Sequence, residues 1–357
     1  MEPEQLRVGV VGCGQIAQIM HLPYLTALPH FAVTAVCDLS PRVVQAVADR
    51  YGVPFRTTDY RGLIARDDVD AVAVLTMEHT AVAVAAADAG KHLFIEKPIA
   101  FSLPEADWII DAVNRAGVTA MVGYMKRYDP GYEFGAARMR AMKDVSLIRV
   151  HDFAGDFVHL TSIFPTVVAD DLAPELFAQQ QAAMAETQQE ALGPRHAHLA
   201  GLYAMLLMLS SHDLTVLRGA FGAPERVLYS DAVSPNQLLS VLDYGEGRRC
   251  IFEAGVGARY HWWDEQMVAY GSEEIIEITF PNPYIPHAPT VVTIRGNEGD
   301  APFVQTIPVS NDEAFCREWV HFAECIRRGE TPRTSLAEAR ADVELAIAMI
   351  QAILVAG

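Results

Sequence analysis

The chain has 357 residues, of which 51% are hydrophobic and 20% are charged, an ordinary globular mixture that can fill sizeable cores. It carries 27 Lys and Arg against 45 Asp and Glu, which gives a formal net charge of −18. Because nucleic-acid binding and attraction to anionic lipid both require clustered basic residues, this balance argues against both partners and favours a soluble one. At about 150 residues per domain, the length predicts two domains.

The N-terminus and the cysteines bear on the compartment. Residues 1–5 are acidic and lead directly into a strand-like run, without the basic flank, apolar core and cleavage site of a secretion signal. The longest apolar stretches, such as 81–87 and 203–209, are much shorter than the roughly 18 residues of a membrane-spanning helix. The five cysteines form no CxxC motif and no zinc-like pairing with histidine. These features predict a cytoplasmic protein with neither a disulfide framework nor a metal site.

Short, Val-rich strands alternate with helices through residue 124. Strands are expected at 6–12, 33–37, 71–75, 91–95 and 119–122, with helices after the first strand and at 41–51, 81–89 and 105–116. Such alternation is typical of a parallel sheet with helices on both faces. We therefore expect an α/β fold in which residues 1–124 form a Rossmann domain with a doubly wound parallel sheet.

Beyond Tyr124 the pattern changes to segments that alternate like antiparallel strands. Strands are expected at 147–153, 226–230, 238–244, 249–254, 266–270, 275–280 and 290–295, a long Ala/Gln/Glu-rich stretch at 170–191, and helices at 199–221, 312–328 and 336–355. This order predicts that residues 125–357 form an α+β domain with a large, open-faced and mostly antiparallel sheet. One face of such a sheet needs a cover, so we expect a homo-oligomer, a dimer or tetramer, formed through it.

A glycine-rich motif follows the first strand and opens the first helix. The pattern GxGxxA is made by Gly12, Cys13, Gly14, Gln15, Ile16 and Ala17. In this context the first glycine allows a tight turn, the second lets the backbone approach a pyrophosphate, and the small third residue lets the helix pack closely on the strand. Asp38 ends the second strand 21 residues after Ala17, close to the spacing expected for the carboxylate that binds the adenosine ribose.

These features predict that residues 1–124 bind a dinucleotide. The alternative is that the glycines only form a tight turn and that Asp38 caps the next helix. Asp38 also bears on the cofactor, because its charge would repel a 2′-phosphate and accept hydrogen bonds from a free 2′-hydroxyl. Arg42 weakens this preference, since a guanidinium could pair with that phosphate. We expect NAD, with NADP less favoured.

A charged pair, Glu96-Lys97, follows the strand at 91–95 at an edge where doubly wound sheets bind ligands. Together with GCGxxA, the runs AGKHxxxEKP and GYMKRYDP, the latter at 123–130, make the first 130 residues similar to the Gfo/Idh/MocA family. Members of this family are nicotinamide-dependent oxidoreductases that act on sugars and cyclitols. The expected open sheet also resembles the second domain of that family, which implies that residues 125–357 bind substrate and form the oligomer contacts.

The resemblance implies a catalytic role for Lys97, which would reach the substrate hydroxyl and the nicotinamide. Removal of hydride from a secondary alcohol leaves a hydroxyl proton to be taken up, and a positioned acid/base contributes roughly 10²–10⁴-fold to such a step. The alternative is a lysine that pairs with Glu96 or with solvent. Thr76, His79 and Glu96 are further expected cofactor contacts, although the role of His79 is open.

The second expected acid/base is His212. The family usually carries DxxxHxxD on a helix, and His212 takes the place of its histidine, while Met208 and Thr215 replace the two acids. Neighbouring helix positions diverge, so Asp213 does not simply replace the missing carboxylate; it would contact substrate or fix a loop. The alternative for His212 is a satisfied core histidine.

Further substrate contacts are expected from Arg127, Asp152 and Asp156. Arg127 matches a family arginine, with an interdomain ion pair as the alternative. Strand alternation places Asp152 on the opposite face from His151, so at most one of them points into a cleft. Two further segments each have two possible roles. The aromatic residues at 260–264 are expected to form a subunit interface, with stacking against a sugar as the alternative. The stretch at 170–191 is either a lid over the active site or a solvated helix.

Three functions are compatible with these residues. The resemblance favours an NAD(P)-dependent dehydrogenase or reductase that transfers hydride between NAD(H) and a secondary hydroxyl or ketone of a sugar, glycoside or cyclitol. A second function, also known in the family, is NAD-dependent cleavage of a glycoside by transient oxidation and elimination. The third is a non-catalytic NAD-sensing regulator, against which the presence of Lys97 and His212 argues.

Overall fold

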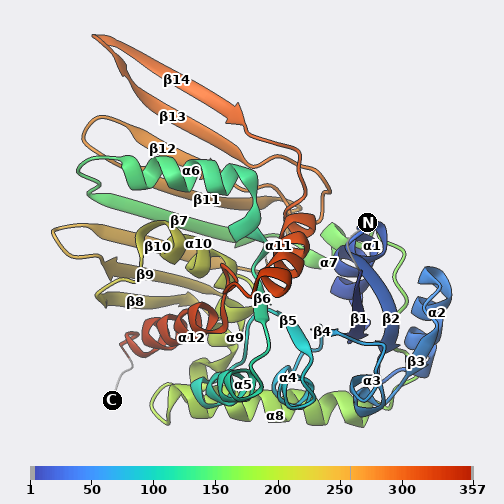
Figure 1. Ribbon diagram of the computed structural model, residues 1–357. Coiled ribbons are helices and arrows are strands. Elements are labelled where there is room, and N and C mark those ends of the chain that lie inside the picture. Colours follow the sequence, from blue (N-terminus) through green and yellow to red (C-terminus); the bar gives the residue numbers. More distant parts are fainter. Residues whose placement is uncertain (1–4, 258, 355–357) are drawn as a thin grey trace. The chain divides into compact units, whose positions relative to one another are not determined.

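The computed structural model describes residues 5–257 and 259–354, and their elements form two compact units (Figure 1). Unit 1 comprises the described residues up to Tyr124 together with Phe164–Thr187 and Phe315–Val343. Unit 2 comprises Met125–Ile163, Gln188–Ala314 and the described residues from Glu344 onwards. The chain thus passes from unit 1 to unit 2 after Tyr124, where the sequence pattern changes. It changes unit again after Ile163, Thr187, Ala314 and Val343.

Unit 1 is built on a six-stranded parallel sheet in the order β3-β2-β1-β4-β5-β6. Its strands are β1 (Leu6–Val11), β2 (Phe31–Cys37), β3 (Phe55–Thr57), β4 (Ala71–Val74), β5 (His92–Glu96) and β6 (Ala120–Gly123). Its helices are η1 (Ala17–His21), α1 (Leu22–Ala27), α2 (Pro41–Tyr51), α3 (Tyr60–Ile64), α4 (Thr80–Asp88), α5 (Leu103–Ala116) and α11 (Ala314–Arg328), while α8 (Pro174–Leu192) and α12 (Leu336–Gln351) continue into unit 2. The strand order confirms the predicted doubly wound sheet.

Local sequence signals explain where the helices of unit 1 begin and end. Helix α2 starts at Ser40, whose hydroxyl accepts a hydrogen bond from the Val43 amide, and Pro41 occupies its first turn. It ends at Gly52, which adopts a left-handed conformation with φ of 65°. All four residues of β4 are buried, as expected for a strand covered on both faces. Because of these local signals, the alternation of strands and helices in unit 1 could be predicted from the sequence.

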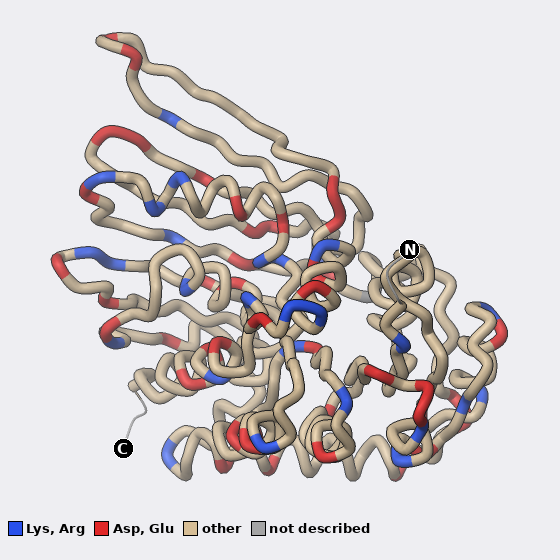
Figure 2. Tube along the Cα trace, in the orientation of Figure 1, with Lys and Arg blue, Asp and Glu red and all other residues tan. Residues whose placement is uncertain are grey.

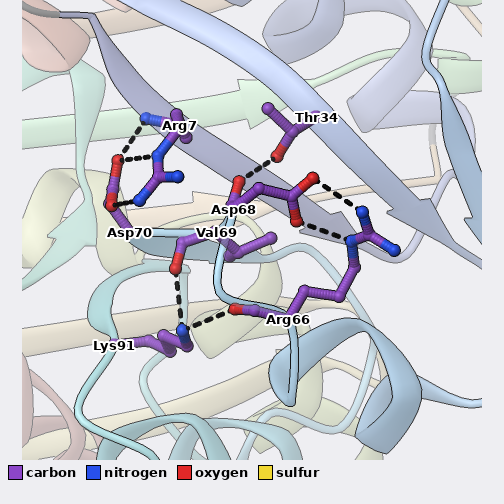
Figure 3. A network of polar contacts seen from close by, with 7 residues as sticks. All are labelled: Arg7, Thr34, Arg66, Asp68, Val69, Asp70 and Lys91. Atoms are coloured by element: carbon purple, nitrogen blue, oxygen red, sulfur yellow. Dashed lines mark hydrogen bonds and ion pairs between the residues drawn. The ribbon is translucent and has the colours of Figure 1, made fainter.

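A polar network ties together the amino ends of the parallel strands (Figure 3). Asp70, just before β4, accepts three hydrogen bonds from the backbone and guanidinium of Arg7 on β1, at 2.9, 2.9 and 2.5 Å. Lys91, just before β5, donates to the carbonyl oxygens of Arg66 and Val69, each at 2.8 Å. These charged side chains therefore secure one edge of the sheet and leave the opposite, carboxyl edge for the glycine-rich loop and Lys97.

Unit 2 is built on an eight-stranded sheet in the order β14-β13-β12-β11-β7-β10-β9-β8. Its strands are β7 (Leu147–Ala154), β8 (Arg226–Ser234), β9 (Gln237–Asp243), β10 (Arg249–Gly255), β11 (Trp263–Tyr270), β12 (Ile275–Thr279), β13 (Val291–Glu298) and β14 (Ala301–Pro308). Its remaining helices are η2 (Met125–Tyr128), α6 (Pro130–Ala141), α7 (Phe157–Thr161), η3 (Ala197–Leu199), α9 (Ala200–Met208) and α10 (Ser211–Phe221). Strands β7 and β10 are parallel and the other pairs are antiparallel.

One face of this sheet is covered by helices. Helix α6 lies along β12 and β13, α10 contacts β7, and α9 contacts β9 (Figure 1). Because α10 also contacts both α6 and α9, the three helices form one layer. Burial alternates along β9 and β10, with every second side chain buried up to the last residue of each strand. The prediction of a mostly antiparallel sheet with one open face is confirmed.

One predicted helix was wrong, and several elements, among them β3, α6 and β14, were not predicted. The single helix expected at 199–221 is broken into α9 and α10, which are bent by 62°. Ser210 lies at the break, and its hydroxyl donates to Asp152 at 2.5 Å, so a tertiary contact fixes the bend. Strand β14 was not expected because it is largely exposed and contains Pro302 and Pro308, residues that sheets tolerate at edges.

The distribution of charged residues and the lengths of the apolar helices match what the composition predicts. Figure 2 shows Lys and Arg interspersed with Asp and Glu along both units. Within the described residues, no single helix has the length and hydropathy to cross a membrane. In the described part of the chain, one bent pair, Ala197–Met208 with Ser211–Phe221, meets those two criteria when both helices are taken together.

The network in Figure 3 predicts a pH-dependent contribution of Asp70 to stability. Hydrogen bonds from Arg7 hold the pKa of Asp70 below its ordinary value, so its stabilising effect is present above that ordinary value and is lost as the pH falls. Asp70→Asn should lower the free energy of unfolding by about 1 kcal/mol at pH 7 and by less at pH 3.5, as measured by urea denaturation. The control, Asp88→Asn, removes an exposed pair with Arg115 and should have little effect. Equal effects of the two substitutions would contradict this assignment.

Candidate functional site

The glycine-rich loop leaves the carboxyl end of β1. Gly12 has a φ of +94°, and a Cβ placed there would lie 2.6 Å from the backbone carbon of Leu75, so only glycine fits. Gly14 is exposed, and apart from its own atoms and those of its chain neighbours, no heavy atom of the described chain lies within 4 Å of the Cβ position that it lacks. Packing does not require glycine at this second position. The space beside Gly14 instead suits the close approach of a pyrophosphate.

The carboxylate of Asp38 joins this loop to the start of α2. One oxygen accepts the Cys13 amide at 2.8 Å and the other accepts the Ser40 amide at 2.9 Å. Ser40, not Asp38, caps the helix. Each carboxylate oxygen can accept more than one hydrogen bond, so Asp38 can hold the loop and still accept a ribose hydroxyl. Of the other loop residues, Gln15 is exposed.

Two further loop residues are partly or fully enclosed by protein. Cys13 is fully buried, and burial raises the pKa of its thiol well above the ordinary value, so it is an inert thiol. Ile16 is half-buried at the start of the helical segment. Their backbones, rather than their side chains, are therefore suited to contact a ligand.

At the carboxyl end of β5, Glu96 is held by two hydrogen bonds. His21 Nε2 lies 2.9 Å from Glu96 Oε1, and the Lys97 amide donates to Glu96 Oε2 at 2.9 Å. The Trp319 indole donates to His21 Nδ1 at 3.2 Å; since an indole can only donate, the proton of His21 lies on Nε2 and points to Glu96. Burial opposes ionisation of Glu96, but the hydrogen bond from His21 and the positive charge of Lys97 lower its pKa. An ionised carboxylate therefore accompanies Lys97.

An aromatic cluster fixes His21 in this position. The rings of Phe94 and Trp319 are stacked with centroids 3.9 Å apart, and Trp319 is fully buried. His21 meets both rings edge-on, at 5.5 and 5.8 Å. His21 and Trp319 are 298 residues apart and belong to no motif, so the sequence gives no signal for their contact. The cluster holds the Glu96 side chain rather than forming a site itself.

The loop after β4 supports the backbone that follows Lys97. His79 is buried, and its Nδ1 donates to the carbonyl of Pro98 at 2.8 Å, next to a cis peptide between Lys97 and Pro98. Burial lowers the pKa of His79, which favours the neutral ring. Thr76 donates to the Glu78 carbonyl at 2.5 Å. The His79 ring thus bonds to the backbone directly after Lys97.

Unit 2 contains a buried acid cluster, formed by Asp152, Asp213 and Glu265. Their nearest oxygens all lie within 4.8 Å of one another, and the three residues are at most 1% exposed. Glu265 bonds to the buried ammonium group of Lys126 and to the indole of Trp263, the latter at 2.6 Å. Such a donor set could hold a metal ion, but Lys126 already supplies a positive charge there. Asp152 and Asp213 were predicted as site residues from the sequence, whereas Lys126 and Glu265 were not.

Burial and mutual repulsion favour protonation within the acid cluster. Burial and then the charge of Glu265 raise the pKa of Asp152 to about 6, and burial together with the neighbouring carboxylates raises the pKa of Asp213 well above its ordinary value. Burial alone would lower the pKa of Lys126, but the three carboxylates outweigh it and raise the pKa. One ammonium cannot balance three buried carboxylates, and a proton shared by Asp152 and Asp213 relieves their repulsion.

His212 lies in the first turn of α10, beside this cluster in sequence. Its side chain is half-buried, whereas that of Asp213 is fully buried in the acid cluster, so the two side chains diverge as expected. Met208 belongs to α9, so the position four residues before His212 is on a different helix. His212 belongs to unit 2 and Lys97 to unit 1.

The remaining expected substrate contacts have structural partners within unit 2. Arg127 donates to the carbonyl and the hydroxyl of Thr215 on α10, at 3.1 and 3.3 Å. Asp156 accepts the His159 amide at 3.2 Å at the start of α7. His151 lies 2.9 Å from Asp264 and is half-buried, on the face opposite the buried Asp152, as alternation predicts.

The raised pKa of Asp152 predicts a decline in stability with rising pH. The folded protein binds this proton more tightly than the unfolded chain, so the stability is fully present below the ordinary carboxyl pKa and is lost as the pH rises through about 6. Asp152→Asn, which mimics the protonated group, should remove this part of the decline between pH 4 and 6.5 in urea denaturation. Asp231→Asn, an exposed position on β8, should leave it intact. An unchanged pH profile for Asp152→Asn would contradict the raised pKa.

The buried ion pair predicts a large loss of stability on removing one partner. Glu265→Gln leaves the Lys126 ammonium without its bonded carboxylate and should lower the free energy of unfolding by about 3 kcal/mol. Glu253→Gln removes the partner of Arg149 at a more exposed site and should lower it by less than about 1 kcal/mol. Thermal or urea denaturation of both variants measures the difference, and a mild effect at Glu265 would show that the pair is not buried as described.

Comparisons with known proteins agree with the geometry of unit 1. Residues 6–124 match the family described as "Oxidoreductase family, NAD-binding Rossmann fold". An uncharacterized oxidoreductase of Bacillus subtilis is 34% identical over 132 residues, which cover 36% of this chain and 38% of that relative's length. A scyllo-inositol 2-dehydrogenase (NAD(+)) of the same organism is 25% identical over 96% of this chain and 93% of the relative.

Solved structures share the fold over almost the whole chain. A 3-ketoreductase from Actinomadura kijaniata, solved with NADP and TDP-benzene, gives a TM-score of 0.74 at 19% identity and covers 98% of both chains. A putative NADPH-dependent oxidoreductase from Desulfitobacterium hafniense gives 0.78 at 15% identity, over 98% of this chain and 96% of that one. Residues 6–124, about a third of the chain, thus match the Gfo/Idh/MocA oxidoreductase family with an NAD-binding Rossmann fold.

Proposed function

We propose that this protein is an NAD-dependent dehydrogenase or reductase that transfers hydride between the cofactor and a secondary hydroxyl or ketone of a sugar, glycoside or cyclitol. One observation carries the proposal. The carboxyl edge of a single sheet presents both an open glycine-rich loop held by Asp38 and Lys97 held beside an ionised Glu96. The first arrangement suits a dinucleotide and the second suits proton transfer beside it.

The cofactor would be held by residues at that edge. They are Gly12, Cys13, Gly14, Gln15 and Ile16 of the loop, Asp38 and Arg42 at the adenosine ribose, and Thr76, Glu96 and Lys97 toward the nicotinamide. His79 would support Lys97 through its hydrogen bond to the Pro98 carbonyl. When bound, the nicotinamide supplies the hydride acceptor or donor. The Asp38 carboxylate favours NAD over NADP, because it accepts hydrogen bonds from a free 2′-hydroxyl and repels a 2′-phosphate.

Lys97 handles the hydroxyl proton in this proposal. Oxidation of a secondary alcohol releases that proton as the hydride leaves carbon, and reduction of a ketone requires one at the same oxygen. The ionised carboxylate of Glu96 accepts the backbone amide of Lys97, and the ammonium group of a lysine can donate a proton to a carbonyl oxygen. The pair of Trp319 and His21 keeps Glu96 in place. His212 is the second proton-transfer group.

The acid cluster positions His212 rather than contacting substrate. Asp152 bonds to Ser210 at the start of α10, and Asp213 follows His212 in that helix, yet both carboxylates are buried. Arg127 bonds to Thr215 on the same helix. The contacts of Asp152 and Arg127 fix the first turn of α10 and therefore the direction of the His212 ring.

The names of relatives support the substrate class. The scyllo-inositol dehydrogenase aligns with nearly the whole chain, and a levoglucosan dehydrogenase of Pseudarthrobacter phenanthrenivorans is 28% identical over 45% of this chain and 43% of that relative. Both substrates carry secondary hydroxyl groups. A cytoplasmic location and a dimer or tetramer through the open sheet face belong to the same proposal, and five free cysteines support the former.

The proposed role of Lys97 predicts loss of turnover without loss of cofactor. Lys97→Ala should reduce kcat by about 10²-fold or more, because the acid/base is removed, while the NAD Kd from calorimetry stays within a few-fold. Lys143→Ala, at an exposed position, should change neither. The assay is a panel of sugars, glycosides and inositols followed for NADH formation and product mass.

Three outcomes of this panel would contradict the proposal. Unchanged turnover in Lys97→Ala would exclude its acid/base role. Release of an aglycone without accumulation of NADH would indicate the elimination reaction. NAD binding without turnover of any substrate class would indicate a sensor.

A further inference from the structure

A short segment beyond the Rossmann domain returns to the glycine-rich loop of unit 1. We call residues 164–171 the strap. Gln18 holds it by two hydrogen bonds to the backbone of Val167, at 2.9 and 2.8 Å, and Arg50 donates to the carbonyl of Pro165 at 3.0 Å. The same Gln18 amide also donates to the Cys13 carbonyl at 2.9 Å. The strap is therefore tied directly to the loop expected to cradle the pyrophosphate.

The strap ends in two aspartates that bind the start of α2. Asp171 accepts the Ser40 hydroxyl at 2.5 Å and the Arg42 amide at 3.0 Å, while Asp170 pairs with the Arg42 guanidinium. Hydrogen bonds from Ser40 and from the Arg42 amide lower the pKa of Asp171, so it is ionised at neutral pH. The two carboxylates of the strap thus bind three hydrogen-bond donors: the Ser40 hydroxyl, the Arg42 amide and the Arg42 guanidinium.

These three donors form the kind of set that binds phosphate. A serine hydroxyl, a backbone amide at a helix N-terminus and a guanidinium are the usual partners of a phosphate dianion. They also begin two residues after Asp38, whose carboxylate bonds to the Ser40 amide. In dinucleotide-binding folds, the residues beside this carboxylate meet either the ribose 2′-hydroxyl or the 2′-phosphate.

We propose that Asp170 and Asp171 are specificity-determining residues, which occupy the subsite for a 2′-phosphate and so select NAD over NADP. This inference rests on the proposed function, since it assumes that the loop binds a dinucleotide. A 2′-phosphate must displace both carboxylates from Ser40 and Arg42 and would otherwise lie against their negative charge. A free 2′-hydroxyl needs only Asp38 and leaves the strap in place.

The cofactor preference thus has two sources that can be separated. Asp38 acts within the Rossmann domain, while the strap acts from a segment more than 120 residues further along the chain. Arg42, which by itself would favour NADP, is neutralised by Asp170. Removing the strap charges should therefore relax the preference even though Asp38 remains.

The test compares the affinities of both cofactors in Asp170→Asn/Asp171→Asn. Calorimetry on the purified full chain should show the Kd for NADP falling by about 10-fold or more, which equals about 1.4 kcal/mol, while the Kd for NAD changes less than 3-fold. The matched control is Glu175→Gln/Glu186→Gln, which removes two exposed charges from α8 and should leave both Kd values unchanged. Asparagine preserves size at exposed positions, so the variant should fold, and retained NAD binding verifies this.

A second measurement follows the strap itself. In the unmodified protein, saturating NADP should increase thermolysin cleavage within residues 164–172, mapped by mass spectrometry, whereas NAD should not, because only the phosphate displaces the aspartates. Equal cleavage with the two cofactors would overturn the inference.

The outcomes separate this inference from the proposed function. If NAD binds and the ratio of the two Kd values in the double variant equals that of the control, the strap does not set specificity and the inference fails alone. If the unmodified protein binds neither dinucleotide, the proposed function fails and the inference fails with it.

Discussion

The carboxylate of Asp38 is the contact on which the organisation of the cofactor edge depends. It fixes the glycine-rich loop through the Cys13 amide and the start of α2 through the Ser40 amide. Because both segments are held by one side chain, the space beside Gly14 and the donors of Ser40 and Arg42 keep a constant separation. The strap uses the second of these segments as its anchor. A change at Asp38 would consequently disturb the loop, the helix start and the strap together.

Buried charge is the corresponding constraint in unit 2. The acid cluster places three carboxylates around one ammonium group, an arrangement that is stable only if protons and hydrogen bonds compensate the excess negative charge. Ser210 donates to one of these carboxylates and thereby sets the bend between α9 and α10. The direction of His212 therefore depends on groups that do not reach the surface. Unit 1 shows the same principle, with Trp319 and His21 supporting Glu96 beside Lys97.

The sequence was informative wherever the signal is local. Alternating strands and helices, the glycine spacing, Asp38 and the Lys97 run all lie within short windows. The alternation predicted the doubly wound parallel sheet of unit 1, although it did not reveal the short strand β3. Contacts between distant residues could not be predicted from the sequence. Lys126 and Glu265 are 139 residues apart, and Asp171 of the strap is 131 residues from Ser40. The helix break was missed because hydrophobic residues lie on both sides of it, although Ser210 and Ser211 are residues that often start helices. Tertiary contacts decided these features.

Lys97 gains a further significance from the choice of basic residues in this chain. Of its 27 basic side chains, 23 are arginines, whose protons are not lost in proteins, and only 4 are lysines. Lys91 is bound to two carbonyl oxygens at the amino edge of the sheet, Lys126 is buried on Glu265, and Lys143 is exposed in unit 2. Lys97 is the lysine at the carboxyl edge. If turnover is measured at increasing alkaline pH, the lysine whose titration affects it at the carboxyl edge is therefore Lys97 alone, because the other three lysines lie elsewhere.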